Sequence, residues 1–233
     1  MAYVALTRDP LKDAPLIRRL DEAGVPHKSV PLLKYAPGPD HDRLVGRLQE
    51  RWDWVIVTSP TAAAFLLAAW EQANKPDLRV AAIGKGTSRA LAAGGLSVVY
   101  TSPQSYGAYL ANDLGGAGRV LWPTSTLAGS GMEKTLAERG FKLIRLDVYQ
   151  TLPRLLSQEE KQQLASATVA ALASPSAVRA WAEASNARPP VAAIGRVSAK
   201  AALKTGFEQV WFPENPSIEG WAGIIVEIYQ RVT

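Results

Sequence analysis

One pentapeptide, Val-Ala-Ala-Ile-Gly, occurs twice in this chain of 233 residues, at Val80–Gly84 and at Val191–Gly195, so the copies lie 111 positions apart. The surrounding sequence repeats too, since the Ser-Pro step that begins at Ser59 is matched by one at Ser174. A unit of this length that occurs only twice is too long for a solenoid repeat. The repetition therefore predicts two similar lobes with a ligand cleft between them.

Short β-rich runs alternate with segments of helical periodicity along the whole chain. In the segment 218–228, for example, apolar residues recur at helical spacing. Strands that alternate with helices form parallel sheets covered on both faces. We therefore predict an α/β fold with two open parallel-sheet lobes, flavodoxin-like or Rossmann-like. The expected strands are 3–6, 28–30, 54–57, 80–83, 98–100, 120–122, 143–146, 168–172, 191–194 and 209–212. Helices are expected to end at Gly24, Gly95, Gly140 and Gly206.

Two extended segments bounded by proline depart from this alternation. They are Pro31–Pro37 and Asp147–Pro153, and prolines at both ends disfavour a helix. We interpret them as a two-stranded antiparallel linker that crosses between the lobes near 32–37 and 147–153. Lobe 1 then comprises 1–34 and 152–233, and lobe 2 comprises 37–148. A tandem division near residue 117 is the alternative, and the repeat spacing alone does not exclude it.

Composition excludes several classes of function. The chain has no cysteine, so disulfide and thiolate chemistry are excluded, and His27 and His41 are the only imidazoles, which argues against a transition-metal site. No apolar run reaches the roughly 20 residues that a membrane helix needs. A strand is expected directly after the N-terminus, with no signal segment before it, so a cytoplasmic location is predicted.

The formal net charge of +5 is compatible with two interpretations. It could attract an anionic partner, or it could be the ordinary solvated charge of a basic protein. Nucleic-acid binding favours clustered Lys and Arg interleaved with aromatic residues. Here the basic residues are scattered along the chain, so no nucleic-acid partner and no membrane partner are predicted.

Most of the expected strands end in a small or hydroxylated residue that opens the next helix. In an open parallel sheet these junctions meet at the carboxyl edge, where ligands bind, and helix N-termini bind anions. Each junction could equally be an ordinary helix cap, because Ser or Thr followed by Pro is a common start. Several junctions around one cleft would suit a ligand with many carboxylates. The junction residues taken as candidates are Thr7, Thr61, Gly84, Ser176 and Gly195.

Familiar nucleotide-binding and catalytic motifs are absent. Gly84-Lys85-Gly86 begins like a dinucleotide fingerprint, but Arg89 stands in place of the third glycine, and no phosphate-loop motif occurs. Neither histidine can be placed in a convincing nucleophilic triad. Tyr149 stands out, because in the second crossing segment its phenol could donate a hydrogen bond to a leaving oxygen. Alternatively, Tyr149 packs a linker strand, as Leu33 would at the equivalent position of the first crossing.

The order and spacing of these motifs resemble the uroporphyrinogen-III synthase family over nearly the whole chain. Each motif is weak by itself, and the ordered set carries the resemblance. The matching residues are Thr7-Arg8, Trp52-Asp53, Ile56–Pro60, Ala82–Gly84 with Thr87, Val148–Thr151, Ser174–Ser176, Ala193–Gly195 with Ser198, and the segment from Pro213 to Trp221.

The resemblance implies a fold and a reaction. It implies two α/β lobes joined by a two-stranded ladder, with the N-terminal strand and the last third of the chain in one lobe, which argues against the tandem division. The implied reaction is a cyclising hydro-lyase step without cofactor or metal, in which linear hydroxymethylbilane becomes uroporphyrinogen III. Loss of the terminal hydroxyl gives an azafulvene cation, and a spiro intermediate inverts ring D. The implied substrate carries eight carboxylates.

The resemblance also implies roles for individual residues. Tyr149 matches the tyrosine proposed in the family to assist loss of hydroxide. Four residues match positions that line the family's cleft: Ser59, Thr87, Ser174 and Ser198. The second glycine loop departs from the usual hydroxyl-rich turn at Arg196-Val197. Three basic residues are added as substrate-binding candidates from charge and location alone: Arg8, Lys85 and Arg196.

Further expectations concern partners and the alternative functions. The resemblance implies a monomer, and we also expect a transient contact with hydroxymethylbilane synthase. A non-catalytic two-lobed sensor that binds a small anion is the alternative function, although no DNA-binding segment is visible in the sequence. A nucleotide-dependent enzyme is disfavoured by the incomplete glycine fingerprints.

Overall fold

The computed structural model describes residues 1–102 and 107–233. It divides the chain into two compact units. Unit 1 contains Met1–Lys34 and Leu152–Thr233, and unit 2 contains Tyr35–Thr151. The chain therefore leaves unit 1 once, forms unit 2 without interruption, and then returns to complete unit 1.

Unit 1 is built on a five-stranded parallel sheet with the order β2-β1-β9-β10-β11. Its strands are β1 (Val4–Leu6), β2 (His27–Ser29), β9 (Val169–Leu172), β10 (Val191–Ala193) and β11 (Val210–Trp211). Its helices are α1 (Pro10–Glu22), α7 (Gln158–Ala165), α8 (Pro175–Ala184), α9 (Arg196–Lys204) and α10 (Ile218–Val232). This is the flavodoxin-like strand order.

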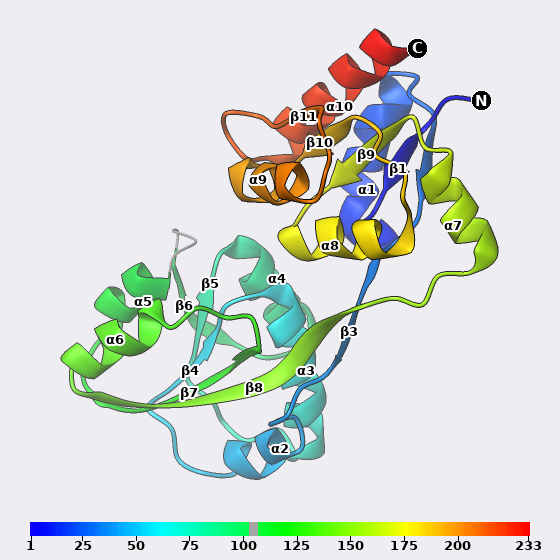
Figure 1. The fold of residues 1–233 in the computed structure, drawn as a ribbon. Coiled ribbons are helices and arrows are strands. Elements are labelled where there is room, and N and C mark those ends of the chain that lie inside the picture. Colours follow the sequence, from blue (N-terminus) through cyan, green and yellow to red (C-terminus); the bar gives the residue numbers. More distant parts are fainter. Residues whose placement is uncertain (103–106) are drawn as a thin grey trace. The chain divides into compact units, whose positions relative to one another are not determined.

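Helices cover both faces of the unit 1 sheet (Figure 1). Val4 and Leu6 of β1 pack with α1 and α10, in a cluster around Trp221. Between them, Ala5 points to the other face and joins the cluster around Trp181, with α7, α8 and α9. Alternation along one strand thus supplies two cores, as expected for a sheet that is buried on both sides.

Unit 2 has a six-stranded sheet with the order β3-β8-β7-β4-β5-β6. Its strands are β3 (Leu33–Pro37), β4 (Trp54–Val57), β5 (Val80–Ile83), β6 (Val98–Ser102), β7 (Gly118–Ser125) and β8 (Phe141–Pro153). Its helices are α2 (Arg43–Leu48), α3 (Pro60–Gln72), α4 (Lys85–Ala93), α5 (Gly107–Asp113) and α6 (Gly131–Glu138). Helices α2, α3 and α4 pack on one face, and α5 and α6 pack on the other (Figure 1).

The two sheets share one spatial order of strands with different connections along the chain. The order β2-β1-β9-β10-β11 corresponds to β8-β7-β4-β5-β6. The two Val-Ala-Ala-Ile-Gly copies form β5 and β10, which occupy equivalent places. In unit 1 the β1/β2 pair precedes the other strands in sequence, whereas in unit 2 the equivalent β7/β8 pair follows them. The repeats therefore represent one fold in two circularly permuted forms.

The sequence-based elements agree closely with the structure, with one informative difference. Strands 54–57 and 80–83 have the expected bounds, and Gly24, Gly95, Gly140 and Gly206 all follow helices with positive φ. We expected a strand at 143–146 followed by an extended crossing segment at 147–153, and the expected end of the strand at residue 146 is wrong. The structure has a single strand, β8, of 13 residues. It pairs with β7 on one side and β3 on the other, and these ladder bonds hold the crossing residues in the sheet.

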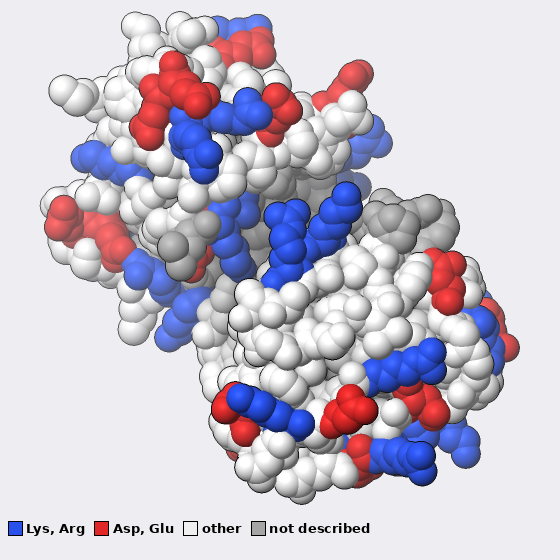
Figure 2. Space-filling view, turned by 180° about the vertical axis from the view of Figure 1, so that it is seen from behind, with Lys and Arg blue, Asp and Glu red and all other residues white. Residues whose placement is uncertain are grey.

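Three features of the described residues concern charged side chains, potential metal ligands and long apolar helices. In Figure 2, basic and acidic side chains are mixed over the visible surface of each unit. Within residues 1–102 and 107–233, no group of three or more His, Asp or Glu side chains is arranged to hold a metal ion. None of the helices in those ranges is long and apolar enough to cross a bilayer.

Candidate active site

The sheet of unit 2 has a point at which the chain connections reverse direction. Strands β4 and β7 are neighbours, but β4 leads on to β5 on one side and β7 leads on to β8 on the other. In open α/β sheets ligands bind at the carboxyl ends of the two strands at such a switch point. Here those ends are occupied by Thr58-Ser59 and by Thr124-Ser125.

Tyr149 projects from β8 into this carboxyl edge, next to Ser59. Its side chain is buried, and its hydroxyl lies 3.1 Å from Oγ of Ser59. One face of the ring stacks on Phe65 with a centroid distance of 5.4 Å, and Tyr35 packs edge-on at 5.8 Å. The phenol is thus enclosed by aromatic rings and directed toward a hydroxyl group at the switch point.

The surroundings of Tyr149 keep its phenol protonated. Burial raises the pKa of Tyr149 above its ordinary value, and hydrogen bonds from the Ser59 and Ser125 side chains oppose this only in part. A phenol ordinarily titrates near pH 10, so Tyr149 is neutral throughout the physiological range. It is therefore available as a hydrogen-bond donor.

Ser59 owes its position to the start of helix α3. It is the N-cap residue, its Oγ accepts the Ala62 N–H at 3.0 Å, and Pro60 occupies the first helical position. A serine hydroxyl has one proton and two acceptor sites. Since the Ala62 N–H uses one acceptor site, the hydroxyl still has its proton and one acceptor site for Tyr149 or for a ligand.

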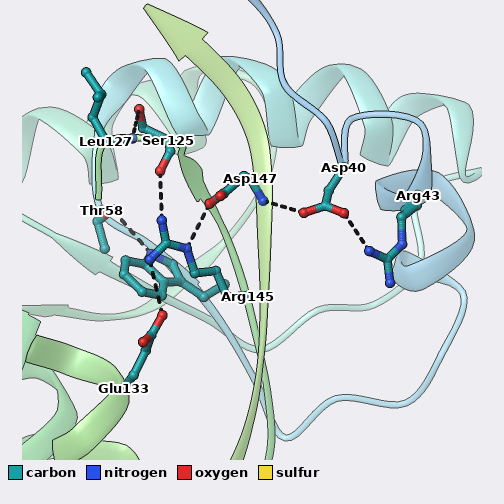
Figure 3. A network of polar contacts seen from close by, with 9 residues as sticks. Asp40, Arg43, Thr58, Ser125, Leu127, Glu133, Arg145 and Asp147 are labelled. Carbon is teal, nitrogen blue, oxygen red and sulfur yellow. Dashed lines mark hydrogen bonds and ion pairs between the residues drawn. The ribbon is translucent and has the colours of Figure 1, made fainter. Parts of the chain in front are cut away.

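A polar network around Arg145 lies next to the ends of β7 and β8 (Figure 3). The Arg145 guanidinium donates to Asp147 at 2.8 Å, to Glu133 at 3.2 Å and to the Ser125 carbonyl at 3.3 Å. It also lies over the ring of Trp122 at 5.3 Å. These contacts brace the two strands that carry Ser125 and Tyr149.

A second group of candidates surrounds the start of α4 in unit 2. Gly84 has φ +76° and is the N-cap residue, so a side chain would be strained there. Lys85, Ser88, Arg89 and Thr101 line a pocket of about 400 Å³. Within the described ranges, Lys85 and Arg89 are exposed and make no ion pair, and Thr87 is buried on the inner face of the helix. The pocket presents two cations next to a helix N-terminus.

In unit 1, the equivalent switch point lies between β1 and β9. The Thr7 hydroxyl is buried and donates to the Ala171 carbonyl at 2.7 Å, so it ties the two strands together. Arg8 was expected to meet a ligand carboxylate, but its guanidinium lies 3.3 Å from the buried carboxylate of Asp13. Arg8 also lies over Trp221 at 5.8 Å. The charge of Arg8 is therefore at least partly balanced by the Asp13 carboxylate inside unit 1.

The remaining candidates of unit 1 lie at the starts of α8 and α9. Ser174 is the N-cap residue of α8, and its Oγ accepts the Ala177 N–H at 3.1 Å. Ser176 accepts a bond from Arg179 in the same helix. Gly195 precedes α9 and packs on Pro216 so closely that a Cβ would lie 3.3 Å from its ring. Arg196 is exposed, whereas Ser198 is buried.

The structure brings Ser59 and Tyr149 together and places Thr61 in the first turn of α3. Sequence reasoning missed three of the residues around them, Tyr35, Phe65 and Arg145, and it did not take Ser125 as a candidate. Ser125 ends an apolar run in the same way as the other strand-end hydroxyls, so its position was a usable signal. Nothing in the sequence pattern pointed to Phe65 or Arg145, because their contacts with the site are tertiary.

A family model described as Uroporphyrinogen-III synthase HemD matches residues 14–223. The chain belongs to the uroporphyrinogen-III synthase family. A relative from Oryza sativa subsp. japonica, named "Uroporphyrinogen-III synthase, chloroplastic", is 36% identical over 245 residues, which cover 96% of this chain and 80% of the relative. The family assignment favours a cyclising lyase-type enzyme over the non-catalytic sensor.

Solved structures of the family share the fold. The uroporphyrinogen-III synthetase of Helicobacter pylori 26695 aligns with a TM-score of 0.67 at 16% identity, covering 98% of this chain and 100% of that chain. A mutant of the uroporphyrinogen III synthase of Thermus thermophilus aligns with a TM-score of 0.62 at 19% identity, covering 99% of this chain and 100% of that chain. These likenesses confirm the predicted α/β fold class with parallel sheets.

Proposed function

We propose that this protein converts linear hydroxymethylbilane into uroporphyrinogen III, with inversion of ring D through a spiro intermediate and without a metal or cofactor. Tyr149 is the catalytic residue in this proposal. The observation that carries it is the 3.1 Å contact between the Tyr149 hydroxyl and Ser59 at the switch point of the unit 2 sheet. Membership of the family supports the reaction, and this contact supports the choice of residue.

The neutral phenol of Tyr149 is suited to the first step. The C–O bond of the hydroxymethyl group breaks, its electron pair stays on oxygen, and the phenol supplies the proton, so that water leaves and an azafulvene cation remains. A carboxylate or an ionised phenol would be a poor donor here. The raised pKa of Tyr149 keeps the phenol in its protonated form before this step.

The later steps depend on positioning. The substituted carbon of ring D attacks the cation to give the spiro pyrrolenine, which fragments and closes again with ring D inverted. Loss of one proton, which the Tyr149 phenolate takes back, restores the enzyme. The competing closure without inversion needs no enzyme, so holding ring D in the correct geometry is the main requirement.

Helix N-termini are proposed to bind the substrate carboxylates. In unit 2 these are the starts of α3 and α4, with Ser59, Thr61, Gly84, Lys85 and Thr87. In unit 1 they are the starts of α8 and α9, with Ser174, Ser176, Gly195, Arg196 and Ser198. Backbone N–H groups and the positive end of each helix dipole favour anions at such positions. In this proposal Thr7 and Arg8 stabilise the carboxyl edge of the unit 1 sheet through their contacts inside unit 1.

Several sequence-based expectations accompany this proposal. A monomeric state, a transient contact with hydroxymethylbilane synthase and a cytoplasmic location are proposed with it. The rice relative is chloroplastic by its name. None of these properties is needed for the chemistry at Tyr149.

The decisive experiment is an isomer assay. Hydroxymethylbilane is generated in situ, the protein is added, and the oxidised uroporphyrins are separated into types I and III. Predominant type III is expected, with the heat-inactivated protein giving type I only. Type I alone at the spontaneous rate, from correctly folded protein, would overturn the proposed function.

A further inference from the structure

Strand β8 changes the direction of its side chains immediately before Tyr149. Along β8, Ile144, Leu146 and Val148 face the core formed with α2, α3 and α4, as alternation requires. Tyr149 should then face the opposite side, with Arg145. Instead it lies in the same core as Val148. A regular strand would turn the phenol away from Ser59.

An irregularity in the β7/β8 pairing accounts for this. Thr124 pairs with Asp147, but the next residue, Ser125, pairs with Tyr149, so Val148 is an extra residue on β8. Such bulges re-aim side chains and recur beside active sites. Here the bulge is what brings the Tyr149 phenol to the side of the sheet on which Ser59 lies.

The bulge is held from the β7 side by Arg145. Its Nε donates to Asp147 at 2.8 Å, just before the extra residue, and Nη2 donates to the Ser125 carbonyl at 3.3 Å, on the residue that pairs with Tyr149. Nη1 is anchored on Glu133 of α6 at 3.2 Å. One planar guanidinium therefore spans the irregular step, as Figure 3 shows.

The other side of the bulge is held by Asp40. Its carboxylate accepts the Asp147 N–H at 3.1 Å (Figure 3), and its own N–H donates to the Asp147 carbonyl at 3.2 Å. The Gly38 N–H donates to the Val148 carbonyl at 2.9 Å. The carboxylate of Asp40 is in turn held by Arg43. The backbone N–H and carbonyl of Asp147 and the carbonyl of Val148 thus have hydrogen-bond partners in the 38–43 turn.

We propose that Arg145 and Asp40 are positioning residues for the reaction, because together they hold the bulge at Val148 that directs Tyr149 toward Ser59. This inference rests on the proposed role of Tyr149. Neither side chain needs to touch the substrate. Their effect is exerted on the position of the phenol.

The test uses Arg145→Met and Asp40→Ala, with Asp40→Asn as the conservative variant that keeps an acceptor oxygen for the Asp147 N–H. Arg119→Met is the matched control. Arg119 lies over Trp52, pairs with Glu50 and donates to the Arg51 carbonyl, but at the opposite end of β7. For each variant of the full chain, the rates of type I and type III formation are measured in the isomer assay. The melting temperature is measured as well.

We expect Arg145→Met and Asp40→Ala to lower kcat by about tenfold to a hundredfold, as expected for a misplaced catalytic group. Asp40→Asn and Arg119→Met should retain most of the wild-type kcat. In the Tyr149→Phe background, Arg145→Met should have little further effect, since both changes act on one phenol. The inference would be overturned if Arg145→Met lowered kcat equally in the wild-type and Tyr149→Phe backgrounds. It would also be overturned if Arg119→Met lowered kcat as much as Arg145→Met does.

A second measurement separates this inference from the proposed function. The ionisation of Tyr149 is followed in the near-ultraviolet as the difference between each protein and its Tyr149→Phe counterpart. The groups that face the phenol are Tyr35, Phe65, Ser59 and Ser125. Arg145→Met should move the Tyr149 pKa, and Arg119→Met should not. Full activity of Tyr149→Phe would reject the catalytic role of Tyr149. An unchanged Tyr149 pKa in Arg145→Met would reject the positioning role of Arg145, whatever the activity of Tyr149→Phe.

Discussion

The hydroxyl of Tyr149 lies 3.1 Å from Oγ of Ser59, although the two residues are 90 positions apart in the chain. Ser59 is fixed by the start of helix α3, and Tyr149 is fixed by an irregular step in strand β8. The contact joins a helix cap and a bulge at the switch point of one sheet. A change in either element should therefore reach the phenol.

Tyr149→Phe should lower kcat with little loss of stability. Phenylalanine keeps the stacking on Phe65 and removes only the hydroxyl, which is the proposed proton donor. General acid groups of this kind contribute about a hundredfold or more. We expect a comparable fall in type III formation in the isomer assay, together with a nearly unchanged melting temperature. An unchanged rate would make the phenol dispensable.

Ser59→Ala should lower both stability and kcat, whereas Ser174→Ala, at a helix start proposed to bind a substrate carboxylate, should lower stability and change KM rather than kcat. Both residues cap helices by accepting an N–H, at 3.0 and 3.1 Å. Loss of either cap should cost about 1 kcal/mol in the free energy of unfolding. Only Ser59 also contacts Tyr149, so the kcat of Ser59→Ala should be lower than the kcat of Ser174→Ala. Equal rates for both would contradict a role of Ser59 at the phenol.

Asp13→Asn should remove a pH dependence of stability. Burial raises the pKa of the Asp13 carboxyl to about 6, with the charge of Arg8 opposing only part of the effect. The folded state thus binds this proton more tightly than the unfolded chain does. The wild type should lose about 1–2 kcal/mol relative to Asp13→Asn as pH rises from about 4 to about 7. Parallel curves of melting temperature against pH would contradict this assignment.

Lys85→Gln and Arg89→Gln should raise KM and leave kcat largely unchanged. Both side chains line the pocket at the start of α4 and are exposed, so their effect on a substrate carboxylate is screened by solvent. About a two- to fivefold increase in KM is expected for each, and it should shrink with added salt. Lys75→Gln is the control, because Lys75 pairs with Glu71 outside this pocket. Identical salt dependence in all three variants would exclude a carboxylate site here.

Gly38→Ala should destabilise the protein, and Gly46→Ala should not. A Cβ on Gly38 would collide with the Asp147 carbonyl oxygen, which is backbone and cannot move aside without disturbing the bulge. A Cβ on Gly46, inside α2, meets nothing within 4 Å, and alanine there should add about 0.5–1 kcal/mol to the free energy of unfolding. Urea unfolding of the two variants tests the contrast. Equal stability would mean that the 38–43 turn can move away from β8.

Much of the fold could be predicted because it depends on local patterns. Buried parallel strands form short apolar runs such as Val80–Ile83, and glycines such as Gly140 mark helix ends through their conformation. The duplicated pentapeptide indicated two similar sheets, and the structure shows that the copies occupy equivalent strands. The strand-end hydroxyls, Ser59 among them, could be recognised from their place after such runs.

The local environment of the site could not be predicted in the same way. Arg8 seemed free from its place after β1, but it pairs with Asp13, one turn into α1. Asp40 lies in a turn just before α2, and its carboxylate accepts a bond from the backbone of β8, 107 residues further on. The sequence around a charged residue does not indicate which residue it will pair with. The partner is known only from the tertiary structure.

The sequence by itself determined the α/β class, the doubled sheet and the family to which the chain is related, because periodicity, caps and ordered motifs are local properties. The tertiary structure alone decided where Tyr149 points. A strand alternates its side chains by default, and the one extra residue at Val148 overrides that rule through contacts with Arg145 and Asp40. Those contacts join segments that are distant in sequence, so no local pattern could reveal them.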